Sequence, residues 1–67
     1  MSVDGKILDD GDVGRDVTYV PNHAGGNAGH RDCERGVITS WNSRFVFVRF
    51  GSSATPKACY PFNLVWG

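Results

Sequence analysis

Two histidines and a cysteine lie close together in the sequence, in the segment from His23 to Cys33. His30 lies between His23 and Cys33, and the second cysteine of the chain, Cys59, follows much later. Imidazole nitrogens and thiolate sulfurs are the ligands that Zn²⁺ prefers, and a structural zinc ion takes four of them in a tetrahedral arrangement. The four residues His23, His30, Cys33 and Cys59 are therefore a candidate site for one structural zinc ion.

Other roles remain open for the same residues. The spacing His-x6-His-x2-Cys is not that of a standard zinc finger, and free cysteines are commonly buried as small apolar residues. We therefore expect no cofactor, with one structural zinc as the alternative. A disulfide between Cys33 and Cys59 is disfavoured in a reducing cytosol. A catalytic thiol at Cys33 would need His30 beside it as a base, and proximity in sequence alone does not provide that geometry.

A second set of candidate residues combines aromatic rings with arginines. Two Trp, two Tyr and four Phe are more than a chain of this size can bury completely, so some must be exposed. Exposed Trp, Tyr and Arg side chains are common anchors of protein interfaces, and rings interleaved with arginines also bind single-stranded nucleic acid. The candidate partner-binding residues are Arg35, Trp41, Arg44, Arg49, Tyr60 and Trp66.

Short β-strands must position these residues. The chain has 67 residues, enough for one small domain that buries about 60% of its unfolded surface. Its apolar residues alternate with period two and show no helical period. This pattern predicts strands over residues 16–20, 35–41, 44–50 and 57–60, then a single helical turn over 61–64 and a short last strand over 65–66.

A long loop over residues 21–32 follows the first predicted strand. Pro21 ends that strand because proline cannot donate a hydrogen bond to a continuing ladder. Loops of this length in compact domains are usually functional or disordered, and a metal ion or a partner would order this one. The predicted strand over residues 44–50 carries large apolar side chains on both faces, which indicates a central position in a barrel.

Charge is distributed unevenly along the chain. The net charge is zero, but residues 1–16 contain five aspartates against one lysine and one arginine, and the remaining residues carry the compensating positive charge. We interpret residues 1–12 as a flexible acidic leader and residues 13–67 as the folded domain. The basic part could bind nucleic acid weakly through phosphate contacts.

No segment indicates a membrane span or an exported protein. The longest apolar run, residues 45–50, contains Arg49 and is far shorter than the ~20 residues that a spanning helix needs. The first ten residues lack the charged-then-apolar pattern of a signal peptide, and two cysteines are too few for a secreted disulfide framework. We therefore expect a cytoplasmic protein that does not enter a membrane.

The order of the predicted elements resembles that of small SH3-like barrels. The segments Gly14-x-x-Val17, Gly36-Val37-Ile38, residues 45–50 and Tyr60-Pro61-x-x-Leu64 fall where Tudor-like and related barrels place their equivalents. The resemblance covers residues 14–66 and implies an all-β fold, a five-stranded SH3-like barrel with a long first loop and one helical turn before the last strand. The chain is also similar to short uncharacterised proteins of bacteriophages and prophages, which implies a bacterial host cell.

One enzyme family shares part of this pattern. Plasmid-borne type II dihydrofolate reductases resemble the chain in length, in barrel class and in the Tyr-Pro-x-x-Leu motif near the end. Those enzymes have Val-Gln-Ile-Tyr before the proline, and the Gln and Ile line the active-site pore. Here the corresponding residues are Lys57-Ala58-Cys59-Tyr60. The sequence also contains no nucleophile elbow or phosphate-binding glycine loop, so we expect no enzymatic activity.

The sequence as a whole predicts a small non-enzymatic binding module that is encoded by a phage or prophage. We expect it to dock on a protein partner through residues 21–35 and the exposed aromatic side chains. Two alternatives remain open. One is a nucleic-acid-binding barrel, and the other is a zinc-stabilised structural or assembly protein that forms homo-oligomers through its strand edges.

Overall fold

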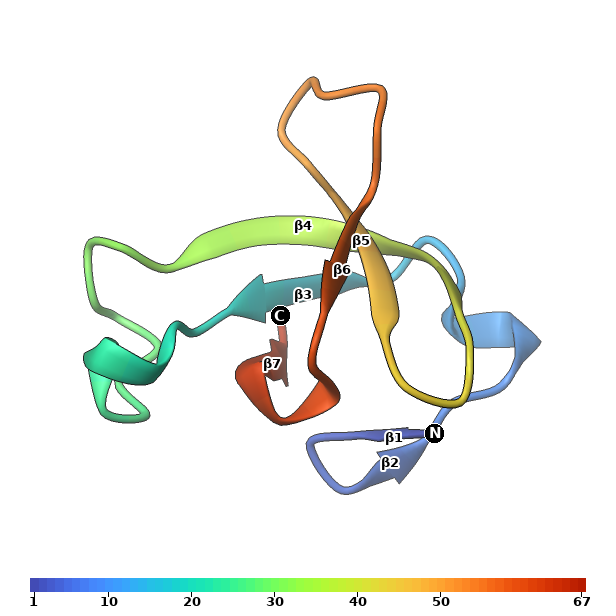
Figure 1. Cartoon of the computed structure of the whole chain (residues 1–67), viewed down its shortest axis with the longest axis horizontal. Helices are drawn as coiled ribbons and strands as arrows, with labels where there is room; N and C mark the ends of the chain where they lie inside the picture. Colours follow the sequence, from blue (N-terminus) through green and yellow to red (C-terminus); the bar gives the residue numbers. More distant parts are fainter.

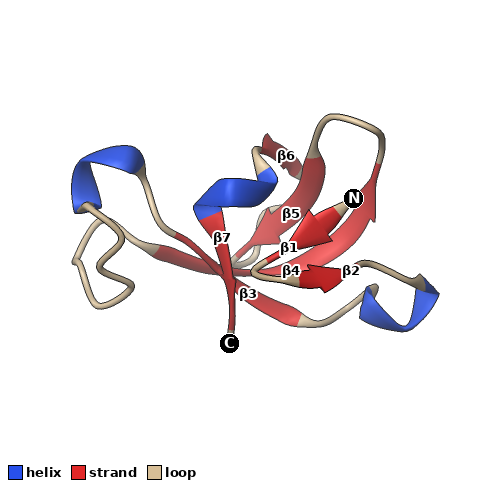
Figure 2. Ribbon diagram, turned by 90° about the horizontal axis from the view of Figure 1, so that it is seen from below, coloured by secondary structure: helices blue, strands red, loops and turns tan.

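The chain folds almost entirely as β-structure. The computed structural model describes residues 1–67, with seven strands, three short 3-10 turns and no α-helix (Figures 1 and 2). The strands are β1 (Ser2–Val3), β2 (Lys6–Ile7), β3 (Asp16–Tyr19), β4 (Glu34–Trp41), β5 (Val46–Phe50), β6 (Lys57–Cys59) and β7 (Leu64–Trp66). The turns are η1 (Asp10–Asp12), η2 (Asn22–Ala24) and η3 (Pro61–Asn63). The predicted all-β class is confirmed, and none of the helical turns is long and apolar enough to cross a membrane.

Five strands form one antiparallel sheet in the order β6-β5-β4-β3-β7. Strand β5 lies between β4 and β6, as its two apolar faces predict, and Val46 and Val48 are both fully buried. The register between β4 and β5 shifts between Ile38 and Ser40, and such a bulge bends a strand and increases its twist. The two edge strands, β6 and β7, are not hydrogen-bonded to each other.

The first twelve residues, predicted as an acidic leader, begin with a hairpin that packs on the domain. Strands β1 and β2 form a hairpin around Asp4 and Gly5, whose φ angles are 49° and 83°. This left-handed pair is the turn that Asp-Gly favours. Val3 and Leu8 belong to the buried core, and Trp66 donates its indole N–H to the carbonyl of Val3 at 3.1 Å. Burial of these two apolar residues, which charge alone does not reveal, fixes the segment.

The core combines this hairpin with the inner face of the sheet. Its buried members are Val3, Leu8, Val17, Ile38, Val46, Val48, Cys59 and Leu64. Gly36 on β4 lets β5 approach closely, because a Cβ there would lie 2.6 Å from a methyl carbon of Val48 and 2.7 Å from the carbonyl oxygen of Arg49. A larger residue at position 36 would therefore displace β5.

A buried carboxylate holds the turn that follows the hairpin. Asp12 is 2% exposed and accepts hydrogen bonds from Lys6 Nζ at 2.7 Å, from Arg15 Nη1 at 2.9 Å and from the Asp9 amide at 3.0 Å. The hydrogen bond from Lys6, followed by those from Asp9 and Arg15, holds the pKa of Asp12 well below its ordinary value. The same bond to Asp12 raises the pKa of Lys6. At least one aspartate of the acidic segment is thus a structural residue.

Candidate functional site

The loop between β3 and β4 is built from successive turns. Its first turn, η2, follows the buried Pro21 and ends at Gly25, whose φ of 62° is left-handed, the usual way to end such a turn. The amides of Asn27, His30 and Cys33 each donate to the carbonyl three residues earlier. Figures 1 and 2 place this loop at one end of the long axis and η1 at the other. The loop therefore has an ordered backbone far from the buried Asp12.

Buried Asn63 fixes the start of this loop. Its side-chain amide donates to the carbonyl of Val20 at 2.9 Å and to the side-chain oxygen of Asn22 at 2.8 Å. Its backbone carbonyl accepts the amide of Val20 at 2.7 Å. These contacts join η3 to the start of the loop, two segments that lie far apart in the sequence. The sequence gives no sign of this role, because nothing distinguishes Asn63 locally from an asparagine in a solvent-exposed turn.

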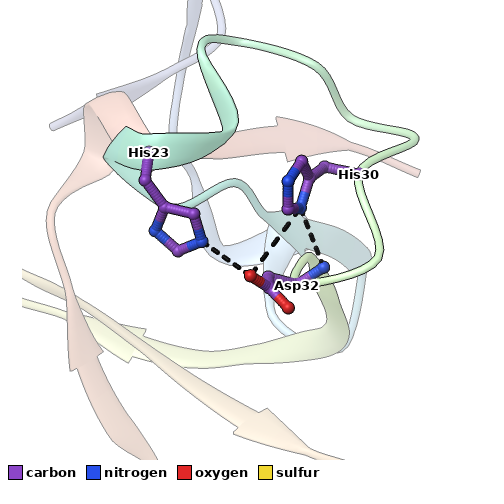
Figure 3. Close-up of side chains that lie close together, drawn as sticks. All are labelled: His23, His30 and Asp32. Carbon is purple, nitrogen blue, oxygen red and sulfur yellow. Dashed lines mark hydrogen bonds and ion pairs between the residues drawn. The ribbon is translucent and has the colours of Figure 1, made fainter.

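Within the loop, His23, His30 and Asp32 come together (Figure 3). Nε2 of His23 lies 2.7 Å from Oδ2 of Asp32. Nδ1 of His30 accepts the backbone amide of Asp32 at 3.0 Å and lies 3.9 Å from Oδ2 of the same residue. One potential ligand atom from each residue lies within 4.8 Å of the others. The two predicted histidines are thus neighbours, and the carboxylate of Asp32, which is not among the predicted ligands, joins them.

The two cysteines lie outside this group, so the predicted set of four ligands is not assembled. Cys33 donates its thiol to the carbonyl of Asn27 at 3.4 Å. Cys59 is buried in β6, where burial, with a smaller effect of the Glu34 charge, raises the pKa of its thiol. A thiol with a raised pKa stays protonated and is a poor metal ligand and nucleophile. Both cysteines are free, so no disulfide joins them.

A second candidate site is an aromatic row on the surface, formed by Phe45, Tyr60 and Phe62. The ring centroid of Tyr60 lies 5.1 Å from that of Phe45 and 5.1 Å from that of Phe62, and the planes of Tyr60 and Phe62 are 15° apart. Tyr60 is 50% and Phe62 73% exposed. Tyr60 precedes η3 and Phe62 lies within it, so this single turn places both rings on the surface.

A shallow groove adjoins the aromatic row. It has a volume of about 280 Å³ and is lined by Phe62 and Val65 from the C-terminal segment and by Pro21, Gly25 and Gly26 from the loop, among other residues. Phe62 therefore belongs to both features, and the aromatic row continues onto the loop between β3 and β4.

Two of the predicted partner-binding residues lie at the aromatic row. Tyr60 is its middle member, and Cζ of Arg44 lies 5.9 Å from the ring centroid of Phe45. The most exposed member, Phe62, was not among the predicted residues. The surplus of aromatic residues indicated that some ring must be exposed, but not which one.

The other predicted partner-binding residues lie elsewhere. Trp41 and Trp66 are partly buried against the core, and Cζ of Arg15 lies 4.2 Å above the ring of Trp66. Arg35 and Arg49 are exposed on β4 and β5. Strand pairing places both on the outer face of the sheet, because Arg49 lies opposite Val37, two residues after Arg35. The six predicted residues thus do not form one surface.

The chain matches no protein-family model, no curated protein and no solved structure.

Proposed function

We propose that the chain is a non-enzymatic binding module that docks on a protein partner through the aromatic row and the adjoining groove. The observation that carries this proposal is the exposure of Phe62, 73%, stacked on Tyr60, whose other neighbour is the tilted ring of Phe45. A single exposed apolar residue is ordinary, but adjoining apolar side chains rimmed by polar residues are typical of an interaction site. Aromatic side chains in such a place are favoured anchors for a protein partner.

The groove supports the same proposal. It extends the surface from Phe62 to Gly25 and Gly26. These two glycines have no side chains, so the backbone is accessible there. At the other end of the row, Arg44 is exposed beside Phe45. An apolar centre with a polar or charged rim is the usual composition of a protein interface. An apolar side chain of the partner would fill the groove, with further contacts along the rings.

We propose further that the domain is an SH3-like barrel. Support comes from the order of its elements, in which a long loop follows the first strand of the large sheet and η3 precedes the last strand, β7. Strand β7 pairs with β3, the first strand of that sheet in the chain. It forms one edge of the sheet, and β6 forms the other. The phage or prophage origin and the bacterial cytoplasm belong to the same proposal and rest on the sequence resemblance alone.

Nucleic-acid binding is the competing function, and it would use a different surface. Arg35 and Arg49 are exposed on the outer face of the sheet and make no ion pair. Phe47, two residues before Arg49 on β5, lies on the same face. Asp16 lies there too, opposite Val37, and its charge opposes phosphate binding. The aromatic row contains two exposed rings, Tyr60 and Phe62, whereas Phe47 is half-buried, so a protein partner is favoured.

The test compares variants of both surfaces. The immobilised chain is used to capture protein from a bacterial extract, and labelled single-stranded oligothymidine is titrated separately. We expect a captured protein that is lost with Phe62→Ser and kept with Ile7→Ser, a matched control because Ile7 is 74% exposed on the N-terminal hairpin. We expect its retention to depend little on salt. Tight oligothymidine binding that weakens steeply with salt and is lost in Arg35→Ala/Arg49→Ala would instead establish nucleic-acid binding.

A further inference from the structure

We propose that His23, His30 and Asp32 bind one divalent transition-metal ion, with Zn²⁺ as the preferred ion, and that this ion cross-links the two ends of the loop between β3 and β4. His23 lies on η2 near the start of the loop, whereas His30 and Asp32 lie near its end. Figure 3 shows both imidazole rings directed toward the Asp32 side chain. None of the three residues belongs to the aromatic row or lines the adjoining groove, so the inference does not depend on the proposed function.

The chemistry of the three donors selects the kind of ion. Two imidazole nitrogens and one carboxylate oxygen form a set that suits zinc and related first-row metals, whereas Ca²⁺ and Mg²⁺ prefer oxygen ligands alone. Three protein ligands leave a fourth tetrahedral position of zinc to water. All three residues have solvent-accessible side chains, with exposures of 63%, 32% and 50% in chain order, so that position is open.

The donor atoms are already close to the separation that a metal ion requires. Neighbouring ligands of a tetrahedral zinc ion lie about 3.3 Å apart, given metal–nitrogen distances of about 2.0 Å. In the structure the Asp32 carboxylate lies 2.7 Å from Nε2 of His23 and 3.9 Å from Nδ1 of His30. Rotation of the exposed His23 and Asp32 side chains covers these differences. Coordination through Nδ1 of His30 would replace its hydrogen bond from the Asp32 amide.

The surrounding loop explains what the ion would contribute. Between Asn22 and Asp32 only Ala24 is buried, so the loop has almost no core of its own and is held mainly by hydrogen bonds. The 2.7 Å contact between His23 and Asp32 already joins its two ends. A coordinated ion would strengthen that connection, because a ligand that binds only the folded state stabilises it.

Calorimetric titration of the untagged, reduced and chelator-treated full chain with Zn²⁺ tests the proposal. We expect one ion per chain and affinity at least about 10-fold weaker in His23→Ala, His30→Ala and Asp32→Asn. Cys33→Ser is the matched control, because Cys33 lies in the same loop but outside the group, and it should bind zinc as the wild type does. Amide chemical shifts should change on zinc addition within residues 22–33 and stay constant in the sheet.

Two outcomes would overturn the proposal. One is the lack of stoichiometric zinc binding by a chain whose spectrum shows it folded. The other is binding that survives in the three ligand variants or disappears in Cys33→Ser. Co²⁺ provides a second readout, since thiolate ligands produce an intense near-ultraviolet charge-transfer band that nitrogen and oxygen ligands do not. The Co²⁺-loaded chain should lack this band, and its presence would assign a cysteine ligand instead.

Discussion

The ring of Phe62 lies stacked on that of Tyr60, with planes 15° apart and centroids 5.1 Å apart, although both side chains are exposed. Each ring restricts the other before any partner arrives. Ordering of side chains is one of the main costs of association, so a stack that exists in the free protein reduces that cost. The stack also explains how two exposed aromatic rings, Tyr60 and Phe62, hold a defined arrangement without being buried.

Phe62→Ser should leave the fold intact. The side chain is 73% exposed, and its ring is stacked on that of Tyr60, an interaction worth about 1 kcal/mol. We expect the free energy of unfolding in urea to fall by no more than about 1.5 kcal/mol, with Ile7→Ser measured beside it as the exposed control. A much larger loss for Phe62→Ser would mean that this ring is part of the fold and would weaken its assignment as a docking residue.

Gly36→Ala should destabilise the domain strongly. The added Cβ would lie 2.6 Å from a methyl carbon of buried Val48 and 2.7 Å from the carbonyl oxygen of Arg49. Overpacking of this kind costs about 1–3 kcal/mol, and here the backbone of β5 must move as well. Gly29→Ala is the control, because its Cβ would meet only the end of the Asn27 side chain, at 3.3 Å. Equal unfolding free energies for the two variants would contradict the close approach of β4 and β5.

Asn63→Ala should loosen the start of the loop. The substitution leaves the carbonyl of Val20 without its side-chain donor and removes the bond to Asn22. Loss of a buried partner costs about 1–3 kcal/mol. Hydrogen exchange should accelerate for amides of residues 20–25 more than for those of β5. Asn22→Ala, which removes only one of the two bonds, should have a smaller effect, and an effect as large as that of Asn63→Ala would show that Asn63 does not act through Val20.

Asp12 should make stability sensitive to acid. Its pKa is lower in the folded chain than the ordinary value of 3.8 that applies when the chain is unfolded. The unfolded chain therefore takes up this proton first as the pH falls, so the contribution of Asp12 is complete above about pH 5 and is lost progressively at lower pH. Asp12→Asn should be less stable at neutral pH and lose less stability on acidification.

The control for that experiment is Asp10→Asn, since Asp10 is exposed and makes no ion pair. The free energy of unfolding in urea is measured for the three proteins across the acidic pH range. Its dependence on pH should be parallel for the wild type and Asp10→Asn. If the curve of Asp12→Asn were parallel to them as well, the carboxylate of Asp12 would not be the group that couples folding to protonation.

The large sheet could be predicted from the sequence because its signals are local. Alternating apolar residues mark β3, and Pro21 marks its end. The Tyr60-Pro61 step marks the start of η3. The predicted start of β5 was two residues early. There the side-chain oxygen of Asn42 accepts the amides of Arg44 and Phe45, which keeps both residues in the turn.

The N-terminal hairpin and the exact composition of the two sites could not be predicted, because they depend on contacts between distant residues. Strand β1 has only two residues, and Val3 is held by Trp66 from the other end of the chain. The proximity of His23 and His30 in the sequence predicts that they are neighbours, but Asp32 and not a cysteine lies beside them, and Cys59 is buried in β6. The exposure of Phe62 is likewise a property of the folded surface alone.

Site-specific photo-cross-linking from position 62 tests the docking surface most directly. A photoreactive phenylalanine analogue replaces Phe62 in one protein and Ile7 in the other, two positions with nearly equal exposure, 73% and 74%. After irradiation in a bacterial extract, we expect a discrete cross-linked protein from position 62 and none of that mass from position 7. The same product from both positions, or a nucleic-acid adduct alone from position 62, would contradict docking of a protein partner on the aromatic row.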